Sequence, residues 1–286
     1  MSCPNTGALT YNGGMNLLRH VLLIAPPCFR ALSAFLAPKN CTANALKLRS
    51  LACLTVLTCL AQSSSHGADA AELKVAVAAN FRAAAQEIGN RFSQKTGVAV
   101  QISSASTGVL AAQMRRGAPF DVLLAADRAR PQALVDDGSS TGPARCYALG
   151  SLVLLGADSL DTALSDPNKS LAIANPRSAP YGAAAMAVLA REDFAAASNR
   201  RVVRGSNVQQ ALQFYTSGGA DLALVARSLS PDSGVPVPSE WHSRIEQYAV
   251  LNARSHNADD ARAFLDYLTG PSAAPVLASF GYQPCS

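Results

Sequence analysis

Two short polar stretches stand directly after apolar runs in this sequence. Asn80 follows the run 73–79, and Ser106 and Thr107 follow the strand-like segment 98–102. An amphipathic helix is predicted to begin at each point, so several unpaired backbone N–H groups meet a small polar side chain there. Such a helix start carries a partial positive charge and binds an oxyanion without a charged side chain. Because neither stretch contains lysine or arginine, the pair predicts one shared site for a small tetrahedral oxyanion.

Each of these polar residues also has a purely structural explanation. Asparagine is a favoured N-cap, and Asn80 is predicted to cap a helix that runs to about Thr96. Ser106 and Thr107 fit a capping pair equally well, and as hydroxyls they fit a hydrolase nucleophile. The hydrolase alternative lacks a G-x-S-x-G motif, and neither histidine after residue 70 has an evident partner acid. We therefore expect no enzyme, no metal site and no cofactor.

The first 70 residues differ from the rest of the chain. They hold five of the seven cysteines and five basic residues against one acid. The apolar run 51–61 follows Lys47 and Arg49 and precedes small residues that end at Ala70, which is the order of a secretory signal. A membrane span needs roughly 20 apolar residues, so an N-terminal anchor is the weaker alternative. We expect export to the periplasm with cleavage near Ala70.

The remaining chain, 71–286, is nearly neutral. The formal charge of +5 lies almost entirely in the leader, because 19 basic and 18 acidic residues remain once its five bases and one acid are removed. No excess of basic residues is left to bind nucleic acid, and we expect a monomer. Two cysteines remain, Cys146 and Cys285. In an exported protein they form either a disulfide or two unrelated thiols, and the sequence leaves both open.

Strands and helices are predicted to alternate from residue 73 and again from residue 149. The strands are expected at 73–79, 98–103, 121–127, 149–156, 170–174, 201–203, 221–226 and 247–251, and the helices at 80–96, 107–117, 183–191, 208–215, 258–268 and 272–280. This pattern predicts an α/β fold with two lobes, each a mostly parallel sheet flanked by helices. Lobe I is expected to hold 71–148 and 249–286 and lobe II 149–248, with the ligand between them.

A series of short motifs resembles one family along the whole of this region. The motifs are KVAVAANF at 74–81, SSASTG at 103–108, GAPFD at 117–121 with AAD at 125–127, NP at 175–176 with APYG at 179–182, NV at 207–208, FLDYLTGP at 264–271 and GY at 281–282. In this order they resemble the periplasmic molybdate-binding proteins of ABC transporters. The resemblance implies a type II periplasmic-binding fold, molybdate or tungstate as the ligand, and a membrane permease as the partner.

The resemblance also implies which residues face the anion. They are Asn80 and Thr107 in the first lobe, Tyr181 and Val208 through backbone N–H groups in the second, and Ala79 and Ser106 as close seconds. The hydroxyl of Tyr181 is accordingly expected to be dispensable. One departure is Ala226, which stands where some family members carry a tyrosine whose hydroxyl reaches the anion. That hydrogen bond is lost here, which leaves affinity and the preference among anions open.

Other functions remain as alternatives. Another tetrahedral oxyanion, such as sulfate, thiosulfate or phosphate, fits the same pattern of neutral donors. A regulator's sensor domain would need a helix-turn-helix segment, which the leader does not supply. The sequence also has no G-x-x-x-x-G-K-[ST] loop, so ATP hydrolysis is expected to belong to a partner.

Overall fold

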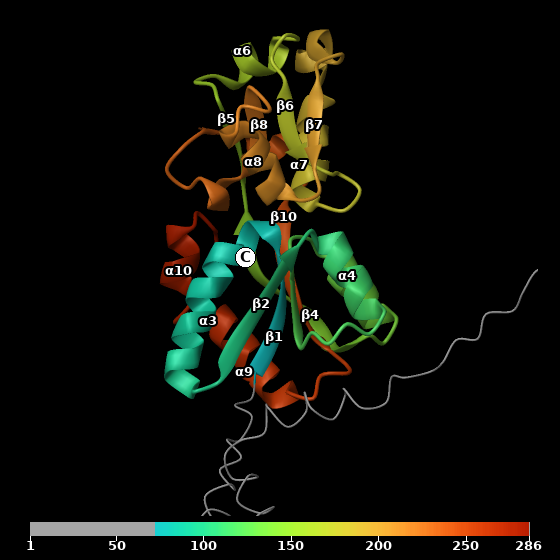
Figure 1. The fold of residues 1–286 in the computed structure, drawn as a ribbon, viewed down its shortest axis with the longest axis vertical. Helices are drawn as coiled ribbons and strands as arrows, with labels where there is room; N and C mark the ends of the chain where they lie inside the picture. The colour runs from blue at the N-terminus through green and yellow to red at the C-terminus, as the bar shows by residue number, and fades with distance from the viewer. Residues whose placement is uncertain (1–71, 286) are drawn as a thin grey trace, which may run out of the picture. The chain divides into compact units, whose positions relative to one another are not determined.

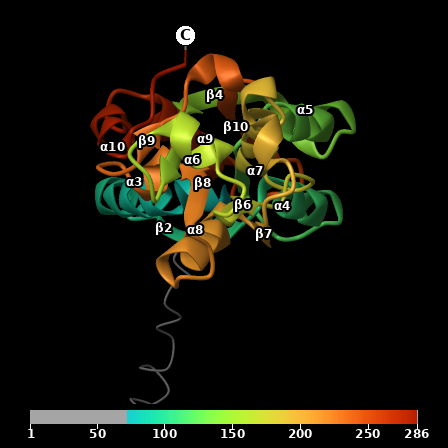
Figure 2. The same ribbon diagram turned by 90° about the horizontal axis from the view of Figure 1, so that it is seen from above.

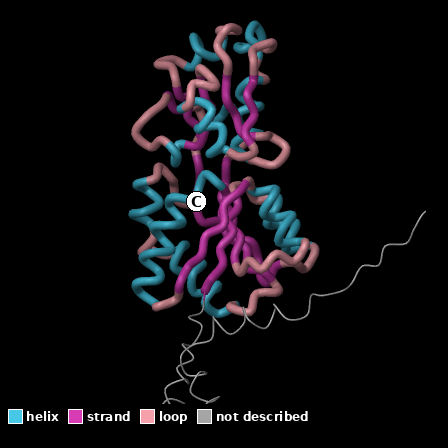
Figure 3. Tube along the Cα trace, viewed as in Figure 1, coloured by secondary structure: helices cyan, strands magenta, loops and turns pink. Residues whose placement is uncertain are grey.

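The computed structural model describes residues 72–285, and these build two β-sheets that the chain links by two crossings (Figure 1). Figure 3 shows strands in both halves, each set bordered by helices. The predicted secretory signal at 51–61 and the cleavage point near Ala70 lie outside the described residues. None of the helices in residues 72–285 is long and apolar enough to cross a membrane.

The first sheet has the order β2-β1-β3-β10-β4. Its strands are β1 (Glu72–Ala78), β2 (Ala99–Ala105), β3 (Val122–Ala125), β4 (Ser140–Gly150) and β10 (Ile245–Asn252). Strand β1 runs parallel to β2 and β3, whereas β10 runs antiparallel to β3 and β4. Helices α3 (Arg82–Thr96), α9 (Ala258–Thr269) and α10 (Ala274–Ser279) lie on one side of this sheet, and α4 (Thr107–Arg115) and α5 (Ala129–Asp136) lie on the other (Figure 2). This sheet and its helices are called the first lobe below.

Strand β1 shows why both faces of this sheet need a cover. Successive side chains of a strand point to opposite faces. Val75 packs in the cluster that contains Phe92 of α3 and Phe264 of α9, whereas Ala76 packs in a second cluster with Leu110 of α4. The continuous apolar run therefore marks a strand that is buried on both sides.

The second sheet has the order β7-β6-β8-β5-β9. Its strands are β5 (Leu152–Leu155), β6 (Leu171–Ala174), β7 (Val202–Gly205), β8 (Leu222–Ala226) and β9 (Val235–Pro236), and its helices are α6 (Leu160–Ser165), α7 (Pro180–Leu189) and α8 (Val208–Thr216). Short 3₁₀ helices complete the described chain: η2 (Ala79–Phe81), η3 (Glu192–Ala197), η4 (Arg227–Leu229) and η5 (Ser239–Trp241). The second sheet and α6–α8 are called the second lobe.

The two-lobe α/β fold is confirmed, with sheets that are mixed rather than mostly parallel. The antiparallel pairs involve β10 in the first lobe and β5 in the second. Each of these strands is the first one after the chain has crossed from the other lobe. The prediction of one strand at 149–156 is wrong. Strand β4 ends at Gly150 in the first sheet, and β5 begins at Leu152 in the second, so the chain changes lobes at Ser151.

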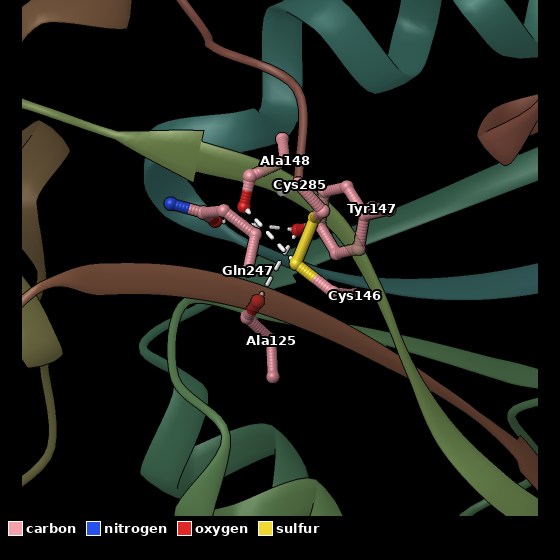
Figure 4. The surroundings of a disulfide bond; sticks show 6 residues. All are labelled: Ala125, Cys146, Tyr147, Ala148, Gln247 and Cys285. Atoms are coloured by element: carbon pink, nitrogen blue, oxygen red, sulfur yellow. Dashed lines mark hydrogen bonds between the residues drawn. A yellow bond between two sulfur atoms is a disulfide. The ribbon is translucent and has the colours of Figure 1, made fainter.

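A disulfide joins Cys146 of β4 to Cys285 beyond α10, with 6.1 Å between their Cα atoms. Figure 4 shows it beside Tyr147, whose hydroxyl donates toward the carbonyl of Ala125 (3.2 Å). The bond closes a loop across a sequence separation of 139. It therefore ties the end of the chain to a strand that leads into the crossing between the lobes.

Candidate oxyanion-binding site

The predicted site residues meet where the two lobes touch. Gly108 at the start of α4 donates its backbone N–H to Ser178 in the loop before α7 (2.9 Å). Ser228 of η4 donates its hydroxyl to the carbonyl of Asn80 in η2 (2.9 Å). A side chain on Gly108 would place its Cβ 3.1 Å from that same Ser178 carbonyl, so the close approach favours glycine there. One buried cluster then contains residues from both sides: Ala79, Ala126, Ala179, Tyr181 and Val208.

Thr107 is held so that its hydroxyl can serve a ligand. Its side chain is 1% exposed, and its Oγ1 accepts a hydrogen bond from the backbone N–H of Ala126 (3.0 Å). A hydroxyl that accepts one bond keeps its own O–H for donation to another acceptor. Ala126 also belongs to the cluster that contains Tyr181 and Val208, so Thr107 joins the second-lobe residues at one place.

Ser106 is the clearest orphan donor of the site. It occupies the N-cap position of α4, but its side chain makes no capping hydrogen bond. The residue is 4% exposed, and its Oγ has no hydrogen-bond partner among residues 72–285. Buried polar atoms are nearly always paired, so an unpaired hydroxyl here points to a ligand. The capping explanation for Ser106 is therefore wrong.

Asn80 lies at the predicted place but does not cap a helix. Helix α3 begins at Arg82 after the η2 turn, and no side chain caps it, so that prediction is wrong. The side-chain amide of Asn80 instead donates to Oε1 of Gln247 (3.0 Å) and to the hydroxyl of Tyr282 (2.9 Å). An amide has two N–H donors, and both are used. What remains for an anion at this residue is its backbone N–H at the start of η2.

The second lobe supplies two helix starts. Tyr181 follows Pro180, the first residue of α7, and Val208 is the first residue of α8. The first N–H groups of a helix have no partner within it. The predicted cap at Asn207 is confirmed, because its Oδ1 accepts from the backbone N–H of Gln210 (3.0 Å). The donors of Tyr181 and Val208 thus lie in the half of the site that faces η2 and α4.

A buried polar cluster next to the site was not predicted. It consists of Asn80, Tyr147, Tyr181, Gln247 and Tyr282, and is called the Gln247 cluster below. Gln247 of β10 is 0% exposed, and its Nε2 donates to the hydroxyl of Tyr181 (3.2 Å) while its Oε1 accepts from Asn80 and from Tyr147 (3.3 Å). The one available signal was a polar residue opening the apolar strand 247–251. The hydroxyl of Tyr181 therefore has a partner, which the sequence did not indicate.

The three tyrosines of the Gln247 cluster remain neutral. Burial raises the pKa of Tyr147 and of Tyr181 well above the usual 10, and the neighbouring phenols raise it further. Burial likewise raises the pKa of Tyr282, although hydrogen bonds from Ser228 and Asn80 oppose the shift. Desolvation disfavours a phenolate, so these hydroxyls act as neutral donors and acceptors at physiological pH.

One ion pair lies next to the predicted site. Arg130 lies beside Gly108, where it forms an ion pair with Asp127 and donates to the carbonyl of Arg177 (3.0 Å). In the described part of the chain, no three His, Cys, Asp or Glu side chains gather as they would around a metal ion. The predicted site residues themselves carry no charged side chain.

A cavity of about 990 Å³ lies at the opposite end of the first sheet, where β1 begins. Its lining includes Asp121, whose carboxylate accepts from the backbone N–H of Lys74 (2.7 Å) and the hydroxyl of Ser255 (2.6 Å). The lining also carries Glu72, Lys74 and Arg254, so two acids balance two bases and the cavity has no net positive charge that would favour an anion. Size alone therefore does not make this cavity the oxyanion site.

Comparison with known families decides the classification. The model of the bacterial extracellular solute-binding proteins matches residues 73–283. The chain belongs to this family. Among curated relatives of this solute-binding protein, the molybdate-binding protein ModA of Azotobacter vinelandii is 40% identical over 229 residues, which cover 75% of this chain and 91% of the relative. The molybdate-binding protein ModA of Rhodobacter capsulatus is 36% identical over 225 residues, covering 75% and 89%.

Solved structures show the same fold. The periplasmic molybdate-binding protein of Azotobacter vinelandii matches this solute-binding protein with a TM-score of 0.70 and 31% identity, over 75% of this chain and 100% of the other. The sulfate-binding protein SubI of Mycobacterium tuberculosis has a TM-score of 0.61 at 17% identity, over 76% and 88%. The second match shows a shared fold alone.

Proposed function

We propose that this solute-binding protein captures molybdate, with tungstate as a second ligand, and delivers it to the membrane permease of an ABC transporter. The observation that carries the proposal is the buried hydroxyl of Ser106, which has no partner in residues 72–285. Ser106 directly precedes Thr107, whose buried Oγ1 accepts from the N–H of Ala126. The identity of 40% to a protein named for molybdate binding supports the choice of ligand. The anion is the cargo, and the proposal includes no cofactor.

The donors of the site are proposed to select the anion by geometry rather than by charge. The set comprises the hydroxyls of Ser106 and Thr107 and the backbone N–H groups at Ala79, Asn80, Tyr181 and Val208. A lysine would attract any dianion at long range, whereas neutral donors at fixed positions favour an anion of matching radius. Each N–H that a smaller anion leaves unpaired costs about 1–3 kcal/mol. Closure of the lobes excludes water and strengthens the bonds that are made.

A different tetrahedral oxyanion, such as sulfate, thiosulfate or phosphate, is the second candidate. The observation in its favour is Ala226, which ends β8 fully buried and carries no hydroxyl where some molybdate-binding relatives are expected to have one. A hydrolase is disfavoured. Ser106 Oγ has no hydrogen-bond partner in the described residues, so no base activates it.

We further propose that the chain is exported, processed near Ala70 and active as a monomer. The family description as extracellular supports export. A relative in Bacillus subtilis, 24% identical over 264 residues, is described as a putative ABC transporter substrate-binding lipoprotein, which supports a permease partner.

Isothermal titration calorimetry of the exported protein tests the ligand. Separate titrations with molybdate, tungstate, sulfate and phosphate should give tight binding for the first two and binding at least a hundredfold weaker for the others, equivalent to ~2.7 kcal/mol. Equal affinity for sulfate and molybdate would replace the molybdate assignment with the second candidate. If none of the four anions gives a binding heat, the proposal that the protein binds an oxyanion is refuted.

A further inference from the structure

Gln247 joins the two lobes through a single side-chain amide. It lies on β10, where the chain re-enters the first sheet and Gln247 stands opposite Ala148 of β4. Its Oε1 accepts from Asn80, a first-lobe residue, and its Nε2 donates to the hydroxyl of Tyr181, a second-lobe residue (3.2 Å). Both of these partners are also site residues, because each offers a backbone N–H at a helix start.

Other hydrogen bonds cross between the lobes, but they differ from this one. Gly108 donates to the carbonyl of Ser178 and Arg130 to the carbonyl of Arg177, both beside the donor set. Ser228 donates to the carbonyl of Asn80, but Ser228 is not itself one of the proposed donors. The amide of Gln247 instead connects the side chain of Asn80 in η2 to the side chain of Tyr181 in α7. Its 0% exposure means that a broken bond is not replaced by water while the lobes are closed.

Asn80 sets the orientation of this amide, because its Nδ2 donates to Oε1 of Gln247 and thereby turns Nε2 toward Tyr181. The hydroxyl of Tyr147 lies 3.3 Å from Oε1 of Gln247, and its neighbour Cys146 is held by the disulfide to Cys285 (Figure 4). Glycine at position 150 leaves room for the hydrogen bond between Gln247 and Tyr181, because a Cβ there would clash with the Tyr181 hydroxyl and with Nε2 of Gln247. The amide therefore has one orientation that satisfies both lobes.

We propose that Gln247 is a positioning residue for anion binding, whose amide couples Asn80 to Tyr181 so that the two halves of the site assemble together when the lobes close. This proposal rests on the proposed function for its ligand. Opening the lobes separates Tyr181 from Gln247, while the bonds of Gln247 to Asn80 and Tyr147 stay within the first lobe. The hydrogen bond to the Tyr181 hydroxyl therefore stabilises only the closed state.

Two matched phenol deletions test the coupling. Tyr181→Phe removes the bond that Gln247 makes to the second lobe. Tyr147→Phe removes a hydroxyl of the same buried cluster whose bonds, to Ala125 and Gln247, remain in the first lobe. We expect Tyr181→Phe to weaken molybdate binding about tenfold, as one unsatisfied buried donor predicts, and Tyr147→Phe to change it less than twofold. Calorimetry gives both values.

Distances between the lobes provide a readout that a merely structural role would not move. Nitroxide labels at Gln94→Cys in the first lobe and Asp161→Cys in the second, both exposed, report opening by double electron–electron resonance. Without any anion, Tyr181→Phe should shift the distance distribution toward the open state, and Tyr147→Phe should match the parent. Gly150→Ala, whose Cβ would displace the Tyr181 hydroxyl, should open the lobes as well and serves if Tyr181→Phe does not fold.

The outcomes separate this proposal from the proposed function. If the parent binds no tested oxyanion but Tyr181→Phe still opens the lobes, the coupling stands and the ligand assignment fails. If the parent binds molybdate and Tyr181→Phe equals it in affinity and in distance, the coupling is refuted and the function stands. Equal effects of Tyr181→Phe and Tyr147→Phe on both readouts would also refute the coupling.

Discussion

Ser106→Ala is the perturbation that isolates one donor of the site. The hydroxyl is buried, makes no capping bond and has no partner in the described chain, so its removal breaks no hydrogen bond within residues 72–285. Other polar site atoms lack this property. Thr107 Oγ1 accepts from Ala126, and the Asn80 amide donates to Gln247 and Tyr282, so changing either residue also disturbs the protein itself.

The expected loss follows from the charge of the ligand. A hydrogen bond to a charged group contributes about 1.5–3 kcal/mol, so Ser106→Ala should weaken molybdate binding roughly 10- to 150-fold. The unliganded variant should be at least as stable as the parent, because the mutation removes an unpaired buried hydroxyl and leaves no other group unsatisfied. Calorimetry measures the affinity, and urea unfolding of the anion-free protein measures the stability.

If Ser106→Ala binds molybdate as tightly as the parent, the hydroxyl does not face the anion and the orphan-donor argument fails. A large loss of stability without anion would instead show that Ser106 has a structural partner. The control is Ser140→Ala, a second buried serine whose Oγ is unpaired but which begins β4, away from α4, and which should leave affinity unchanged.

Four further predictions follow from the same contacts. Thr107→Val should weaken molybdate binding by ~1.5–3 kcal/mol and also destabilise the protein, because the Ala126 N–H loses its acceptor. Thr107→Ser keeps a hydroxyl and should retain both the affinity and the stability. Equal affinities of Thr107→Val and the parent in calorimetry would show that Thr107 does not contact the anion. Reduction of the bond between Cys146 and Cys285 should lower the free energy of unfolding by about 2–5 kcal/mol and shift the intact mass after alkylation, and free thiols in freshly exported protein would contradict it. The free energy of unfolding should stay level from pH 7 to about 9 and fall once the pH exceeds the pKa of about 10 that tyrosine has in the unfolded chain. The reason is that the folded protein raises the pKa of Tyr147 and Tyr181, so only the unfolded chain releases protons in that range. Urea titrations at several pH values measure this, and a fall that begins near pH 8 would contradict neutral buried phenols. N-terminal sequencing of the exported form should begin within a few residues of Ala71, and a product that retains 51–61 would indicate a membrane anchor instead.

Strand and helix positions were predictable where the apolar pattern is strong. The run at 73–79 corresponds to β1, and the cap at Asn207 is followed by α8 as expected. Such features are local, because burial of a strand and capping of a helix leave their pattern within a few residues. The crossing at Ser151 was missed, since the apolar end of β4 at 147–149 lies only three residues from the apolar β5, and only their pairing partners distinguish the two strands.

The sequence predicted which residues meet between the lobes but not the contacts that their side chains make. Helix starts at Thr107, Tyr181 and Val208 meet as the sequence suggested. Asn80 was predicted to cap a helix, but its side-chain amide donates instead to Gln247 and Tyr282, which lie far along the chain. Contacts over such separations depend on tertiary packing, and a single sequence does not carry that information in its local pattern.

The most direct test of the central claim is a crystal structure of the exported protein with molybdate, using the anomalous scattering of molybdenum. We expect one strong peak between the lobes, with anion oxygens within hydrogen-bond reach of the hydroxyls of Ser106 and Thr107 and of the backbone N–H groups of Tyr181 and Val208. A peak only elsewhere, for example in the cavity beside Lys74 and Arg254, would contradict it.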